Sequence, residues 1–264
     1  MERQVKTKFV VAAVVALVSF ALKRHYADAT TDALSWILTP TAHLVSLVTG
    51  VAFTAVPGEG YFSAERMFLI EKACAGINFM IGAFAMMAFA LLHRARSVRD
   101  ATAVVGVSLV ASYLAAVIVN ALRIVIAMWL AAHPVGWSSL TAAEIHRLEG
   151  ITVYFGGLLV LYALVQRVDR GSAWPRFLLP LACYYLVTLG LPLANGAYGQ
   201  AFLAHALIVL LVPPVLISLV SGARRVFLLY TRRSVSAGSS VQARRAGSHA
   251  ATTATSTMAP ALNR

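Results

Sequence analysis

Charged residues are scarce in this chain. Lysine, arginine, aspartate and glutamate make up 12% of its 264 residues, whereas soluble domains carry about 25%. Hydrophobic residues reach 59%. So little charge over this length excludes an ordinary soluble domain and predicts a protein that lies in lipid.

Cysteine is rarer still, since the chain holds only Cys74 and Cys183. We expect the two at different depths of the membrane, which disfavours a disulfide between them. Cys183 falls in the middle of an apolar run and is expected to pack without chemistry. The histidines, cysteines and acidic residues show no zinc-ligand spacing, and no glycine-rich phosphate loop occurs. The sequence therefore predicts neither a metal nor a cofactor.

Long apolar runs are what the chain has instead. A membrane-spanning helix needs roughly 20 apolar residues, and five runs come close to or pass this length. A sixth run, Phe9–Leu22, is shorter, but basic side chains at both of its ends can reach the headgroups. The five longer runs are Ala73–Leu92, Ala101–Val119, Gly150–Val168, Phe177–Ala194 and Ala201–Val220. The sequence predicts an all-α, polytopic membrane bundle of about six transmembrane helices.

Positive charge is unevenly distributed and predicts the orientation of these helices. Lysine and arginine gather at the N-terminus, around 94–99, around 167–176 and in the tail, whereas acidic residues mix with them at 57–72 and 133–149. Cytoplasmic loops are enriched in lysine and arginine. Both termini are therefore expected in the cytoplasm, and this holds only if Ala33–Val56 does not cross the membrane.

The segment that must stay outside is expected to form an amphipathic or re-entrant helix near 33–50, because Pro40 and several polar residues interrupt it. Strand-forming residues follow on both sides of a Pro-Gly turn signal. A small β-hairpin over 53–63 is therefore expected, and 67–70 is a candidate for a further strand.

The tail after residue 222 differs from the rest of the chain. It is rich in alanine, serine and threonine, with seven arginines and no acidic residue. Such a composition predicts disorder. Beside a last membrane span, a basic tail indicates binding to anionic lipids on the cytoplasmic leaflet, not to nucleic acid.

Cys74 opens one of the apolar runs, in Ala73-Cys74-Ala75-Gly76-Ile77. At the start of a helix, unpaired backbone amides and the helix dipole favour a thiolate. Gly76 removes bulk beside the thiol, and Asn78 lies one turn further on. The alternative is that Cys74 is only a small packed side chain. A catalytic thiol would need a cation and a base as partners.

Arg123 is the stronger anomaly, because an arginine among isoleucines and valines is costly in lipid and marks function by default. Asn120, three residues earlier, shares its helix face. The alternative is an arginine that reaches the outer headgroups from a helix end. The functional interpretation is a cation turned into the bundle, where it holds a thiolate or an oxyanion.

Two histidines compete for the role of base. His146 lies just before the run that starts at Gly150, on the expected outer face, whereas His133 closes the preceding helix, where a histidine is often only a cap. We choose His146. Cys74, Arg123 and His146 are then expected near helix ends on one side of the membrane.

These motifs, taken in order, resemble the exosortase/archaeosortase family. They are Ala73-Cys74-Ala75-Gly76-Ile77, Asn120-x-x-Arg123-Ile124 and His146-x-x-x-Gly150. The continuation Cys-Ala-Gly-Ile-Asn-Phe is most similar to the exosortase K branch, although the usual motif has serine where this chain has Ala75. The similarity covers roughly residues 5–168, so we divide the chain into a catalytic core (1–168), two additional transmembrane helices (169–221) and the basic tail (222–264).

The resemblance implies a multi-span cysteine transpeptidase or peptidase of a prokaryotic cytoplasmic membrane. Its substrates would be membrane-anchored proteins with a C-terminal sorting tag, namely a short motif, one transmembrane helix and an Arg-rich end, while the acceptor amine is left open. Cys74, Arg123 and His146 match the proposed catalytic cysteine, arginine and histidine of the family. The catalytic site would lie on the outer face.

Two other classes of protein fit parts of the sequence. A small membrane transporter or channel would carry polar residues at mid-membrane in several helices, whereas here the spans are nearly free of them. A purely structural membrane subunit would not explain why an arginine, Arg123, lies in an apolar span. The enzyme is the interpretation that uses all three residues.

Overall fold

The structure is a computed structural model of the chain, and it describes residues 2–133, 141–169, 171, 175, 177–194, 196, 199–200 and 202–222. The chain divides into two compact units, Met1–Pro214 and Val215–Arg264. The expected basic tail falls, except for Gly222, outside the described residues. The site and the cavity described below lie in the first unit.

Five helices in the described part are long and apolar enough to cross a membrane: Gln4–Asp28, Lys72–Ala90, Val98–Ala132, Ala143–Val168 and Phe202–Gly222. The segment expected as a further span forms a shorter apolar helix, Leu178–Ala194. It consists of α6 (Leu178–Tyr185), a π-helical turn η4 (Leu186–Gly190) and α7 (Leu191–Ala194). The predicted helical membrane bundle is confirmed, while a count of six spans and their orientation stay predictions.

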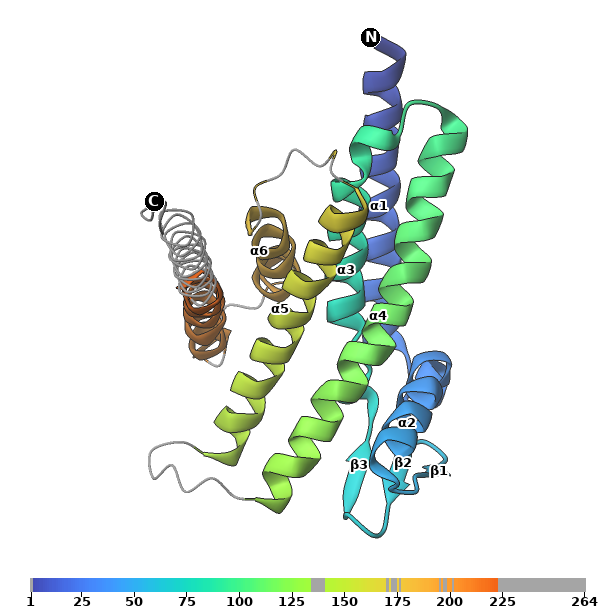
Figure 1. Cartoon of the computed structure of the whole chain (residues 1–264). Coiled ribbons are helices and arrows are strands. Elements are labelled where there is room, and N and C mark those ends of the chain that lie inside the picture. Colours follow the sequence, from blue (N-terminus) through green and yellow to red (C-terminus); the bar gives the residue numbers. More distant parts are fainter. Residues whose placement is uncertain are drawn as a thin grey trace, which may run out of the picture. The chain divides into compact units, whose positions relative to one another are not determined.

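The helices run alternately up and down (Figure 1). α1 (Glu2–Asp28) and α4 (Val98–Ala132) descend, whereas α3 (Ile77–Ala90) and α5 (Ala142–Val168) ascend. α3 is central, because 78% of its span is buried, against 28% in α4 and 11% in α1. It packs against α1, α4, α5 and α6.

One end of the bundle is fixed by an ion cluster. Arg94 Nε lies 2.7 Å from Asp169 Oδ2, and His93 Nε2 lies 3.2 Å from the same oxygen. These contacts join the loop before α4 to the loop after α5. The two arginine-rich loops that were expected on one side of the membrane therefore lie at the same end of the bundle.

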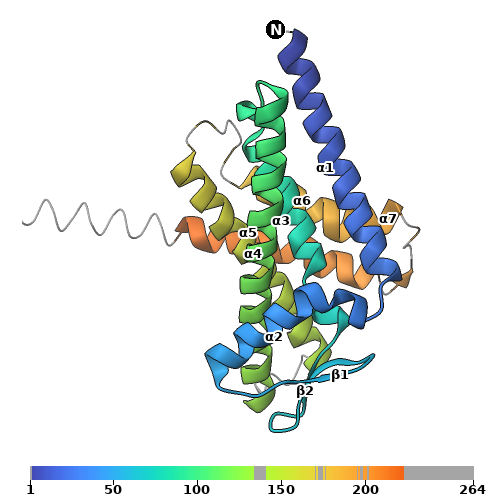
Figure 2. The same ribbon diagram turned by 90° about the vertical axis from the view of Figure 1, so that its right-hand side faces the viewer.

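The opposite end carries α2 (Ser35–Thr49) and a small sheet (Figure 2). α2 packs against α4 and is followed by three short strands, β1 (Thr54–Val56), β2 (Gly60–Ser63) and β3 (Phe68–Ile70). The strands form an antiparallel sheet in the order β1-β2-β3. A helix and strands thus lie where the sequence placed them, and a position of α2 outside the membrane stays a prediction.

Local signals set where the helices around the site begin. The side chains of Ser97 and Asp100 form a capping box at the start of α4, and those of Thr141 and Glu144 form one at the start of α5. α3 starts only at Ile77, because Gly76 has a left-handed backbone with φ of 68°. The residues before it, Lys72–Cys74, form a 3₁₀ turn, η2.

Candidate functional site

Cys74, Arg123 and His146 come from three different elements, η2, α4 and α5. Their places differ from the expected helix ends. Cys74 precedes α3 instead of lying in its first turn. α4 continues past Arg123 to Ala132, and α5 already begins at Ala142, so Arg123 and His146 both lie within helices. The early start of α5 was missed because a capping box at Thr141 and Glu144 joins the polar stretch with His146 to the apolar run that follows.

Arg123 is turned into the bundle, with 8% of its surface exposed. Its Nη2 lies 2.7 Å from Nε2 of His146, and its Nη1 donates to the Tyr154 hydroxyl at 3.4 Å. Its Nε lies 3.6 Å from Glu149 Oε2. The guanidinium also lies over the Tyr154 ring, 5.3 Å from the centroid. An arginine that merely reaches the headgroups is therefore excluded.

Cys74 is held through its backbone. Asn120 Nδ2 donates to the Cys74 carbonyl oxygen, and the Tyr154 hydroxyl donates to Asn120 Oδ1 at 2.8 Å. The thiol is free and half-buried, and it lies close enough to the guanidinium of Arg123 for an electrostatic interaction. A chain of polar contacts thus runs from Cys74 through Asn120 and Tyr154 to Arg123 and His146.

Two glycines make room for this arrangement, as the sequence motifs suggested. A Cβ on Gly76 would lie 3.1 Å from the Asn120 side chain, in addition to the strain of its left-handed backbone. A Cβ on Gly150 would lie 3.2 Å from Arg123 Nε. Each glycine therefore allows one polar side chain of the site to approach the neighbouring backbone closely.

Glu149 and Tyr154 are members of the site that sequence reasoning did not select. Glu149 is buried, with 4% of its side chain exposed, and its Oε2 lies 3.7 Å from His146 Nδ1. Neither of its oxygens has a hydrogen-bond partner among the described residues. The spacing could have indicated Tyr154, because His146, Gly150 and Tyr154 follow one another at four-residue intervals along one face of α5.

Asn78 and His133 lie outside the contacts around Arg123. Asn78 does not support Cys74, because its Oδ1 accepts a hydrogen bond from Lys23 Nζ at 2.7 Å. His133 is the C-cap of α4, and its Nδ1 contacts the Trp129 carbonyl oxygen at 3.0 Å. His133 has the capping role that the sequence suggested for it and takes no part in the contacts around Arg123.

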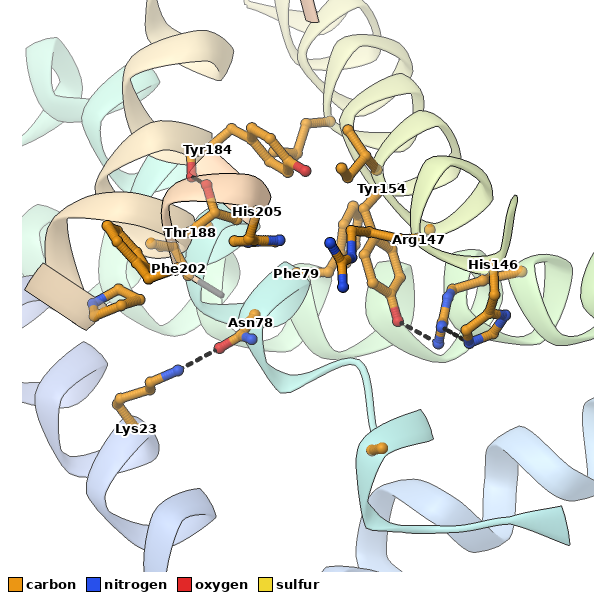
Figure 3. Close-up of a pocket in the computed structure, with 18 of the residues that line it drawn as sticks. Lys23, Asn78, Phe79, His146, Arg147, Tyr154, Tyr184, Thr188, Phe202 and His205 are labelled. Carbon is orange, nitrogen blue, oxygen red and sulfur yellow. Dashed lines mark hydrogen bonds between the residues drawn. The ribbon is translucent and has the colours of Figure 1, made fainter. Parts of the chain in front are cut away.

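A cavity of about 770 Å³ opens beside Arg123 and His146. Figure 3 shows Tyr154, Arg147 and His146 on one side and Tyr184, Thr188, Phe202 and His205 on the other. The cavity is large enough for a small ligand or an extended peptide segment. The helix Leu178–Ala194 and the helix that starts at Phe202, for which the sequence offered no role beyond anchoring, form one of its walls.

The arrangement has a definite chemical capacity. A guanidinium has donors only, so His146 Nε2 is the acceptor in the bond from Arg123. Arg123 also has its Nη1 and Nε groups directed at oxygen atoms of Tyr154 and Glu149. A buried cation with several donors beside a free thiol is suited to stabilise negative charge on sulfur or on an oxygen attached to it.

Comparison with known proteins adds no relative, since no family model, no curated protein and no solved structure matches the chain. The resemblance to the exosortase/archaeosortase family rests on the residues of the three motifs alone.

Proposed function

We propose that this chain is a membrane-embedded cysteine transpeptidase or peptidase that processes membrane-anchored proteins with a C-terminal sorting tag. The observation that carries the proposal is the environment of Arg123. It is buried, it contacts His146 at 2.7 Å, and Tyr154 and Asn120 link it by hydrogen bonds to the backbone of Cys74. A buried arginine is costly unless it has a task, and His146 and Cys74 supply one.

The reaction would begin when a substrate carbonyl reaches Arg123. In the free protein, the lone pair of His146 Nε2 accepts from Arg123. A carbonyl oxygen that takes the guanidinium donors releases this lone pair, and Nε2 then accepts the proton of the Cys74 thiol. Substrate binding would thus both polarise the carbonyl and free the base, which links activation of the nucleophile to the presence of substrate.

The Cys74 thiolate would attack the carbonyl carbon and form a tetrahedral intermediate whose oxyanion Arg123 stabilises. Loss of one such donor typically costs about 10²–10³ in rate. Collapse breaks the C–N bond, His146 returns its proton to the leaving amine, and a thioester with Cys74 remains. An amine or a water molecule then attacks the thioester, which releases the product and restores the thiol.

The grouping of the polar contacts in one cluster favours an enzyme over a transporter or channel. A transport path needs polar groups along the depth of the bundle. Here the contacts of Asn120, Arg123, His146 and Tyr154 form one cluster, and the cavity wall beyond them is largely apolar, with Leu158 and Val187.

The two cysteines provide a matched test. A substrate with a short motif, one transmembrane helix and an Arg-rich end is co-expressed with wild type, Cys74→Ser or Cys183→Ser. Processing should be lost only with Cys74→Ser, because Cys183 is buried in α6, whereas hydrogen bonds through Asn120 and Tyr154 link Cys74 to Arg123. Equal processing by both variants would exclude Cys74 as the nucleophile. An impermeant maleimide added from outside the cell should label Cys74, and failure to label it would contradict an outer catalytic face.

A further inference from the structure

The cavity is lined by basic side chains without any acidic one. Its lining includes Lys23, Arg123 and Arg147 together with His146 and His205, and among the described residues that line it there is no aspartate or glutamate. The charge of Arg123 is paired, because its Nε lies 3.6 Å from Oε2 of Glu149, which does not line the cavity. The other basic groups come from three separate helices, α1, α5 and the helix that starts at Phe202.

Lys23 and Arg147 bring positive charge to the cavity. Neither side chain forms a salt bridge to any residue that the structure describes. Lys23 Nζ donates to Asn78, which is a neutral acceptor. Glu144 is the acidic residue nearest to Arg147 on its N-terminal side along α5, but its Oε2 already accepts from the Thr141 amide and hydroxyl at 2.7 and 2.8 Å. The cavity is therefore a site for negative charge.

These basic residues lie near the ends of their helices. Lys23 is in the last turns of α1, Arg147 is in the first turns of α5, and His205 is in the first turn of its helix. Figure 3 shows Lys23, Arg147 and His205 directed into the same space from different sides. Basic side chains near the ends of membrane-spanning helices can reach lipid headgroups.

The wall beyond the cations is apolar. It is formed by Ile151, Leu158, Val187 and Phe202, of which the first three are buried. Val187 belongs to the π-helical turn η4, which interrupts the helix between α6 and α7 at the cavity. Such π turns are frequent at functional sites. A small soluble anion would leave this wall in contact with water, and a neutral lipid would leave the cations unpaired.

We propose that the cavity binds one anionic phospholipid, with its phosphate on Lys23, Arg147 and His205 and an acyl chain on Ile151, Leu158, Val187 and Phe202. Basic side chains near helix ends, beside an apolar wall, match the two parts of such a molecule. The binding site needs neither Cys74 nor any chemistry at Arg123. It therefore stands or falls separately from the proposed transpeptidase reaction.

The test is native mass spectrometry of the full chain, purified in detergent and incubated with phosphatidylglycerol or phosphatidylcholine. Wild type should retain one phosphatidylglycerol in preference to phosphatidylcholine. Lys23→Gln and Arg147→Gln should each weaken retention about fivefold, as expected for one basic residue at a lipid surface. Both variants are expected to fold, because a glutamine amide in place of the Lys23 ammonium can still donate to Asn78, and because Arg147 is exposed.

Arg96→Gln is the matched control, because Arg96 is exposed in the loop before α4, at the other end of the bundle. It removes the same charge and should leave retention unchanged. Thr188→Trp, which places a bulky indole ring in part of the cavity, should also weaken retention. Glycerol 3-phosphate, which lacks the acyl chains, should not displace the lipid at equal concentration.

Three results would overturn the proposal. The first is equal retention of the two lipids, and the second is a loss in Arg96→Gln as large as in Arg147→Gln, which would indicate only non-specific attraction to a basic protein. The third is displacement by glycerol 3-phosphate, which would identify a site for a soluble phosphate. If Lys23→Gln does not fold, the comparison of Arg147→Gln with Arg96→Gln decides the matter.

Discussion

Nη2 of Arg123 and Nε2 of His146 lie 2.7 Å apart, and this contact defines the state of the histidine. Because the guanidinium only donates, the proton of a neutral His146 is assigned to Nδ1, which lies 3.7 Å from the buried Glu149 carboxylate. Arg123 and Glu149 therefore hold the imidazole between them. The proposed base is restrained on both sides before any substrate arrives.

Glu149→Gln should lower kcat about ten- to hundredfold with little change in KM. The substitution keeps the shape of the side chain but removes the charge that attracts Arg123 at 3.6 Å and His146 at 3.7 Å. Each loss of about 1.4 kcal/mol in transition-state stabilisation lowers the rate about tenfold. Glu149→Asp, which keeps the charge, should recover part of the loss. A rise in KM alone, or no rescue by aspartate, would contradict a positioning role. Steady-state kinetics of substrate cleavage supply the measurement.

Gly150→Ala should impair processing although it favours the helix. The new Cβ would lie 3.2 Å from Arg123 Nε and push the guanidinium from its place. Gly156→Ala is the matched control, because a Cβ there meets nothing within 4 Å on the same helix. Both variants gain up to about 1 kcal/mol of helix propensity. Melting temperature and activity are measured for both variants. Neither should melt earlier than wild type, and only Gly150→Ala should lose activity. Equal activity of the two variants would contradict the site geometry.

Arg123→Lys should reduce processing by about 10² or more, even though the charge is kept. A lysine ammonium cannot reach His146, Tyr154 and Glu149 from one position, as the planar guanidinium does. His146→Ala should be equally severe, whereas His133→Ala should be tolerated because His133 only caps α4. Processing assays on the three variants test this, with membrane insertion checked in each. Full activity of Arg123→Lys would remove the proposed role of the guanidinium.

Asp169 should make stability depend on pH at the other end of the bundle. Burial acts to raise its pKa, but the Gly171 amide and the cations Arg94 and His93 hold the pKa below its ordinary value. The carboxylate therefore stabilises the fold above about pH 3.9, the pKa of an unfolded aspartate, and this contribution is lost as the pH falls through the lowered pKa. Asp169→Asn should melt earlier than wild type at pH 7 and differ little near pH 3. Glu65→Gln, at an exposed site, should show no difference at either pH.

The helical bundle could be predicted from the sequence because lipid imposes length and apolarity on every span. Length and apolarity did not predict where the helices begin. The polar first turns of α5, with His146 and Glu149, depend on the capping box of Thr141 and Glu144, which hydropathy does not detect. The reactive residues were selectable because a cysteine, an arginine and a histidine are exceptional at such positions.

The members of the site that were missed are ordinary residues in sequence. Tyr154 resembles any interfacial tyrosine until its hydroxyl is seen between Arg123 and Asn120. Glu149 was assigned to a loop of mixed charge and is instead buried. Asn78 was expected beside Cys74, but Lys23 of α1 binds it, and no local pattern indicates a contact between helices so far apart in sequence. Roles that depend on packing between spans could not be predicted from one sequence.

The most direct measurement is to trap the acyl-enzyme. Wild type and Cys74→Ala are incubated with a tagged substrate, quenched, and analysed by peptide mass spectrometry before and after hydroxylamine. The proposed reaction predicts a substrate fragment attached to Cys74 in wild type, released by hydroxylamine as a thioester should be, and absent from Cys74→Ala. An adduct that persists without Cys74, or cleavage by Cys74→Ala at the wild-type rate, would contradict a cysteine acyl-transfer enzyme.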